Sequence, residues 1–247
     1  MSYYQLSVSW GPRAERMSAC ATRFVVMLEK LAAEHSTLAS WFKQARTRAT
    51  AFESFCIMPP RQAELEEILH RGRQFTSGSR ELIPELGYSV AAWNGQDEPY
   101  ELSFHVRPGG YNPQLLYPNE VCIPTLRPGN RELLNAVVLK RILLTIADCW
   151  DADWSVVETW DYQGKTLDAQ GRPLLPYGGW LTYLSPALAE KVSSPPDIAA
   201  ESLPNGALFM LATEEQFDVA NPVHVANLDA IQKALAPVQR SVGSVGT

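Results

Sequence analysis

Apolar and polar residues alternate along some parts of the chain and follow a helical period along others. Residues 4–10 alternate between large apolar and polar side chains, which predicts a strand with one buried face. Gly11-Pro12 is expected to end this strand and to begin a helix, because proline suits the first helical turn. Apolar residues between Met17 and Ala32 recur at helical spacing and predict the clearest amphipathic helix of the chain.

Further periodic segments follow, separated by glycine, proline and asparagine. Asn94-Gly95 lies between two of them and predicts a turn between antiparallel strands. Asn130 precedes the most apolar stretch and is the expected N-cap of a buried helix. The predicted elements are helices over 38–43, 61–71 and 131–148, strands over 88–93, 100–107, 121–123, 154–160, 180–184 and 207–211, and a last helix from Asn221-Pro222 that stops at Pro237.

The order of these elements predicts the fold class. It is typical of an α+β protein with a mostly antiparallel sheet, flanking helices and one buried central helix, and it lacks the strict alternation of doubly wound folds. We expect residues 1–247 to form a single domain, with two sub-lobes dividing near residues 76–86 as the alternative. The small residues of 241–247 are expected to form a frayed tail.

Composition and charge narrow the function classes. The chain has 21 Lys and Arg against 27 Asp and Glu, a net charge of −6, and 46% hydrophobic residues, as in soluble globular proteins. This charge argues against a nucleic-acid binder, which needs a basic patch, but it leaves room for an acidic surface that meets a basic partner. Residues 133–146 are too short to span a bilayer, which takes about 20 apolar residues. The N-terminus lacks a secretory signal, so a cytoplasmic location is expected.

Metal-binding and catalytic motifs are scarce. The four cysteines are far apart in the sequence, so we expect free thiols and no structural zinc. The sequence has no Gly-rich phosphate-binding loop and no dinucleotide fingerprint, and no cofactor is expected. Asp151-Ala152-Asp153 resembles a cation-binding D-x-D, but no nucleotide-binding unit accompanies it. His105 shares the polar face of its strand with Glu101, Ser103 and Arg107, a pattern of either a small catalytic site or the solvent side of a half-buried strand. The cysteines are Cys20, Cys56, Cys122 and Cys149.

The most informative segment is 148–161. It holds five acids, three tryptophans and no basic residue. Acidic side chains oppose the dipole at a helix C-terminus, so Asp148 has no evident local reason to be there. Tryptophan is common at binding hot spots, and acids suit a basic partner, whereas the alternative is a buried core beside a solvated turn. The predicted partner-binding residues are Asp148, Trp150, Asp151, Asp153, Glu158, Trp160 and Asp161.

Motifs near both ends of the chain resemble the immunity protein 52 family of bacterial polymorphic toxin systems. The C-terminal motif, Gly179 to Leu184, follows a proline-rich loop. The overall character is also similar to immunity proteins paired with type VI secreted, restriction-endonuclease-like DNases of Pseudomonas. The N-terminal motif comprises strand 4–8, Trp10-Gly11-Pro12-Arg13, Glu15, Cys20-Ala21, Arg23, Leu28 to Leu31 and Trp41-Phe42.

This resemblance implies a cytoplasmic, non-enzymatic protein that binds and neutralises a cognate toxin, expected to be a basic nuclease. It assigns no contact residue, since Trp10, Gly11, Trp41 and Trp180 fit structural roles equally well. Two alternatives stay open. One is a small-molecule hydrolase or transferase with a site near His105, and the other is an adaptor within a secretion apparatus.

Overall fold

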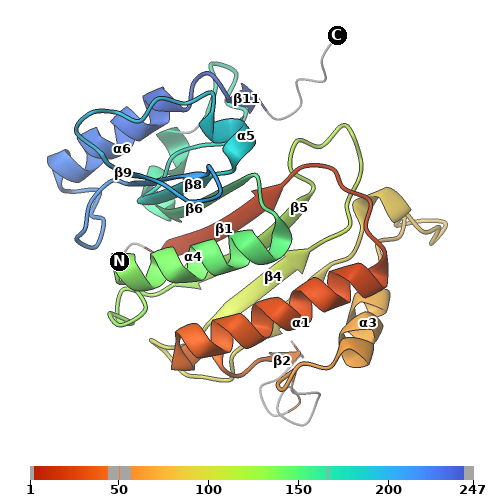
Figure 1. Ribbon diagram of the computed structural model, residues 1–247. Coiled ribbons are helices and arrows are strands. Elements are labelled where there is room, and N and C mark those ends of the chain that lie inside the picture. The colour runs from red at the N-terminus through yellow and green to blue at the C-terminus, as the bar shows by residue number, and fades with distance from the viewer. Residues whose placement is uncertain (1–2, 44–49, 51–56, 166, 242–247) are drawn as a thin grey trace.

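The protein is an α+β structure built on one nine-stranded antiparallel sheet, as the sequence predicts (Figure 1). The computed structural model describes residues 3–43, 50, 57–165 and 167–241. The strands of the sheet follow the order β2-β3-β4-β5-β1-β6-β8-β10-β9. They are β1 (Tyr4–Trp10), β2 (Phe42–Lys43), β3 (Val90–Trp93), β4 (Ser103–Arg107), β5 (Asn119–Leu126), β6 (Trp154–Thr159), β8 (Leu181–Leu184), β9 (Ala199–Ser202) and β10 (Leu208–Leu211).

The helices are α1 (Met17–Glu34), α3 (Gln62–Arg71), α4 (Ala136–Trp150), α5 (Pro186–Ala189) and α6 (Pro222–Ala234). Helices α1 and α4 pack against the nine-stranded sheet, α3 packs against α1, and a small second sheet lies beside the main one. Short 3-10 helices are η1 (Ser36–Leu38), η2 (Pro84–Leu86) and η3 (Trp160–Lys165), and β7 (Leu174–Leu175) pairs with β11 (Arg240–Ser241).

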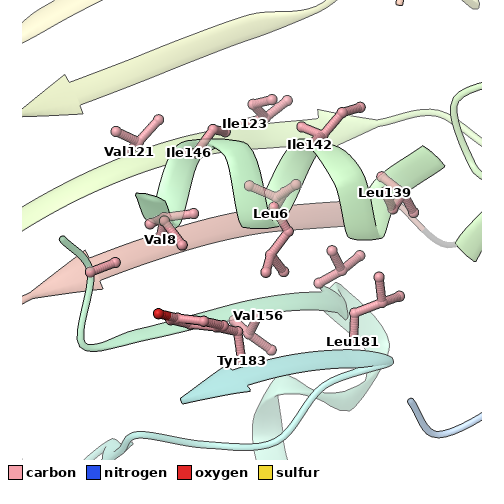
Figure 2. Close-up of a cluster of buried hydrophobic side chains, with 14 of the residues drawn as sticks. Leu6, Val8, Val121, Ile123, Leu139, Ile142, Ile146, Val156, Leu181 and Tyr183 are labelled. Atoms are coloured by element: carbon pink, nitrogen blue, oxygen red, sulfur yellow. The ribbon is translucent and has the colours of Figure 1, made fainter. Parts of the chain in front are cut away.

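Helix α4 is the buried central helix that the sequence predicts. It lies beside α1 across the sheet, while α6 lies at the far end, beyond β8 (Figure 1). Leu139, Ile142 and Ile146 point from α4 toward the middle strands, where they meet Leu6 and Val8 of β1 (Figure 2). Burying such side chains contributes about 1.5–3 kcal/mol each, so this layer is a main source of stability.

Strand β1 is buried on both faces, which corrects the prediction of a strand with one buried face. It pairs with β5 on one side and with β6 on the other, at the centre of the sheet. Its polar residues Ser7 and Ser9 are therefore as well covered as its apolar ones. Alternation signals a solvated face only when neighbouring elements leave that face open.

Three predicted boundaries differ in the structure. Helix α1 begins at Met17, five residues after Pro12, so Gly11-Pro12 ends the strand without starting the helix. Residues 38–43 form the end of η1 and the edge strand β2 in place of a helix. The N-cap of α4 is Asn135, whose side chain accepts from the N–H groups of Val137 and Val138, and Asn130 closes the preceding turn.

The C-terminal part of the sheet contains a strand that the sequence reasoning missed. Residues 199–202 form β9, the outermost strand, and β10 lies next to this edge, although residues 207–211 predict a central strand. Cys20, Cys122 and Cys149 are buried free thiols, as expected. Cys56 and residues 242–247 of the predicted tail lie outside the described residues, and the single-domain organisation stays a prediction.

Candidate partner-binding surfaces

The acidic, tryptophan-rich segment 148–161 runs from the last turn of α4 through a tight turn, along β6 and into η3. Its exposed residues form two groups at opposite ends of β6, about 20 Å apart for a six-residue strand. The predicted residues divide by burial: Asp148, Asp151, Trp160 and Asp161 are exposed, Asp153 is half-buried, and Trp150 and Glu158 are buried.

The two buried residues and Asp153 hold the fold together. Trp150 stacks on Trp10 with ring centroids 5.1 Å apart, and its indole N–H points to the Met27 sulfur at 3.1 Å. The Asp153 carboxylate accepts a 2.8 Å hydrogen bond from the backbone N–H of Gly11. The Glu158 carboxylate accepts from the Tyr177 hydroxyl. Burial raises the pKa of Tyr177, and the negative charge of Glu158 raises this pKa further, so the Tyr177 hydroxyl stays a proton donor.

Basic residues of the N-terminal region neutralise the exposed acids at the end of α4. The Lys30 ammonium lies 2.8 Å from a carboxylate oxygen of Asp148, which gives Asp148 the local partner that the sequence reasoning did not find. This contact raises the pKa of Lys30. Asp151 adopts a left-handed conformation with φ of 45°, and its carboxylate lies 2.7 Å from the Arg23 guanidinium. A count of charges within segment 148–161 therefore overstates the negative charge at the C-terminal end of α4.

Arg13 and Arg23 also cap the C-terminus of α4. Arg13 donates to the carbonyl oxygen of Trp150 at 2.8 Å, and Arg23 donates to that of Cys149 at 2.9 Å. The last carbonyls of a helix have no partner within the helix, so these guanidinium groups complete its hydrogen bonding. Burial works against the charge of Arg23, but the hydrogen bond and the charge of Asp151 outweigh it and raise the pKa of Arg23.

The polar face of β4 does not converge into a catalytic cluster. Glu101 pairs with Arg127 at 3.5 Å, and Glu120 pairs with Arg107. A pocket of about 120 Å³ borders Glu101, but His105 stands outside it and is exposed. The geometry thus matches the solvent side of a strand better than a hydrolase site.

The Asp151-Ala152-Asp153 motif does not form a cation site. One carboxylate binds arginine and the other binds a backbone N–H group. Within residues 3–43, 50, 57–165 and 167–241, no group of three or more His, Cys, Asp or Glu side chains is arranged to hold a metal ion. In the same ranges, no helix is long and apolar enough to cross a membrane.

A different surface, around the outer strand β9, combines a groove with an excess of acids. The groove has a volume of about 510 Å³ and lies between the start of α4 and strands β9 and β10. Residues 190–218 carry six acidic residues and one lysine, and all seven are exposed. The sequence reasoning passed over this stretch, although a charge count over a window of that length would have found it. The charged residues are Glu190, Lys191, Asp197, Glu201, Glu214, Glu215 and Asp218.

Comparison with known proteins identifies one family. The family model of immunity protein 52 matches residues 2–239, nearly the whole chain. Among solved structures, the chain is similar to a Pseudomonas aeruginosa T6SS protein, with 10% sequence identity and a TM-score of 0.46, over 94% of this chain and 73% of that one. No curated protein gives a significant match.

Proposed function

The chain belongs to the immunity protein 52 family, and from this premise we propose that it binds and neutralises a cognate secreted nuclease toxin in the cytoplasm of the producing cell. The observation that carries the proposal is the family match over residues 2–239. In this role the protein acts by association and carries out no chemical step.

The net charge of the chain supports a basic partner. A nuclease presents a positive surface to the phosphates of its substrate. A protein with a net charge of −6 attracts such a surface over long distances, which raises the association rate at low ionic strength. The proposed toxin is therefore a basic nuclease, and DNA is its substrate in this proposal.

The exposed members of segment 148–161 are candidate contacts of this partner. Asp148 and Asp151 form one group beside the basic residues of α1, while Trp160 and Asp161 form the other beside Tyr3. Trp160 is 50% exposed, an unusual exposure for a tryptophan, and its ring meets the Tyr3 ring edge-on at 6.3 Å. Trp150 and Glu158 would act only through the fold, because neither reaches the surface.

Co-expression with the product of the neighbouring gene tests the function. We expect this product to stop growth of the host when it is expressed alone, and growth to recover when the full chain is present. The two proteins should also co-purify, and the complex should lack the DNA cleavage of the free partner. Persistent toxicity with full expression of both chains, or cleavage by the purified complex, would contradict the proposal.

A further inference from the structure

Strand β9 leaves one edge of the main sheet open. It pairs with β10 on one side, and no other strand in the described part of the chain pairs with its outer side. All four of its residues are exposed. Natural edge strands are often protected by shortness, a charged side chain, proline or a bulge. Strand β9 is only four residues long and carries Glu201, but its sequence, Ala-Ala-Glu-Ser, contains no lysine or proline.

The register shows which backbone groups face outward. The backbone N–H of Leu203 donates to the carbonyl of Ala207 at 2.8 Å, next to the pair of Ser202 with Leu208. Hydrogen-bonded and non-bonded pairs alternate in an antiparallel ladder. The N–H and C=O groups of Ala200 and Ser202 therefore point away from β10, where an added strand would find them.

The groove lies where the side chains of such a strand would point. Its apolar lining includes Val137 of α4, Ala199 of β9, and Phe209 and Leu211 of β10. Val137 is 64% exposed, although it belongs to the central helix α4. When a peptide extends a sheet, its backbone bonds to the edge and alternate side chains enter pockets beside it. The open edge and the groove together have the form of such a site.

The negative charge around β9 indicates which kind of strand would bind to this edge. The stretch 190–218 has a net charge of −5, from six acids and one lysine, out of −6 for the whole chain. Glu201 pairs with Lys140 across the groove, while Glu214 borders the groove and is exposed. A second copy of this chain would bring the same negative charge to the edge, whereas a basic segment would neutralise it.

We infer that β9 and its groove bind an extended basic segment of the cognate toxin, which joins the sheet as a tenth strand. The inference rests on the proposed function and adds a second contact surface to the exposed residues of segment 148–161. The side chains of this segment that face α4 are apolar and fill the groove, and its lysine and arginine side chains meet the surrounding acids.

Amide hydrogen exchange in the complex with the neighbouring gene product tests the backbone contact directly. In the free protein, the outward amides of Ala200 and Ser202 should exchange rapidly, and in the complex they should become protected. Unchanged exchange in a complex that forms would overturn the inference and leave the proposed function standing. Failure to form any complex would overturn both.

Two substitution pairs separate strand addition from other contacts. Ala200→Pro removes an outward donor without breaking the ladder to β10, and Ala200→Ser keeps that donor. Val137→Lys places a positive charge in the groove. Its matched control is Val223→Lys. Val223 is 62% exposed and, like Val137, is the second residue of a helix that has an asparagine N-cap. It does not line the groove.

We expect Ala200→Pro and Val137→Lys each to weaken binding of the full chain to the toxin by about tenfold or more, and both controls to stay within about twofold of wild type. Glu214→Lys should slow association more than Asp161→Lys does. Circular dichroism should show folded protein in every variant. Equal affinity for Ala200→Pro and Ala200→Ser would refute the strand addition. If the free chain self-associates and Ala200→Pro abolishes this self-association, the strand that binds β9 belongs to a second copy of the chain. This result would also refute the inference.

Discussion

Replacing Arg23 by methionine should destabilise the protein although this residue lies at the surface of the fold. Its guanidinium contacts Glu15 at 3.0 Å, the carbonyl oxygen of Cys149 at 2.9 Å and Asp151 at 2.7 Å. The variant leaves the Cys149 carbonyl without this donor, which costs about 1 kcal/mol, and the two carboxylates add about 1 kcal/mol more because Glu15 is well covered. The expected loss is about 2 kcal/mol.

Thermal unfolding measures this loss. For a chain of this size, about 2 kcal/mol corresponds to a decrease in Tm of about 4–8 °C. The control is Arg71→Met, because Arg71 forms an exposed pair with Glu67 within one helix, and such pairs contribute about 0.3–0.5 kcal/mol. The Asp151→Asn change should also cost less in the Arg23→Met background than in the wild type, since the two residues are coupled. Equal melting temperatures of Arg23→Met and Arg71→Met would refute this account of the α4 terminus.

Three further predictions concern the close packing at Gly179, two buried thiols and the N-cap of α4. Gly179→Ala should yield mostly insoluble protein, because its new methyl group would overlap side-chain and backbone atoms of β6, whereas Gly78→Ala, with open space around it, should purify normally. Burial raises the pKa of Cys20 and of Cys122 to about 12, so the free energy of unfolding, measured with urea, should fall as pH rises above about 9, where the unfolded thiols ionise first. Each thiol should account for roughly 1 kcal/mol at pH 10, and a flat profile between pH 8 and 11 would contradict this. Asn135→Ala should lower the free energy of unfolding by about 1 kcal/mol in the same urea assay, through loss of the α4 cap, and an unchanged transition midpoint would show that the cap is dispensable.

The long periodic segments predicted their elements correctly, because the residues that recur at helical spacing are also the residues that the fold buries. The stripe of α1 and the apolar run of α4 each occupy most of one helix, so local pattern and tertiary packing require the same residues. Strand β9 could not be predicted in this way. Ala-Ala-Glu-Ser has little preference for extended structure, and its conformation depends on pairing with β10. The choice between Asn130 and Asn135 as the helix cap was likewise decided by tertiary packing.

The charge of segment 148–161 shows what a local count misses. Two of its acids, Asp148 and Asp151, are paired with Lys30 and Arg23, which lie more than a hundred residues earlier in the chain and reach them only through the packing of α1 beside α4. The burial of Glu158 has the same origin, since β6 is enclosed between β1 and β8. Sequence could identify an unusual segment, but the fold decides which of its charges face a partner.

The central position of β1 has a consequence for synthesis of the protein. Strand β1 pairs with β5 and β6, so its second neighbour is made only about 150 residues after it, on the order of ten seconds or more at usual elongation rates. During that interval the apolar side of β1 has no completed sheet to join. The nascent chain is therefore exposed to aggregation and to chaperones until β6 emerges, and the outer strands β10 and β9 can assemble only after that. Under the proposed binding mode, a chain that ends before β9 lacks the edge that binds the toxin, so protection depends on molecules whose synthesis is complete.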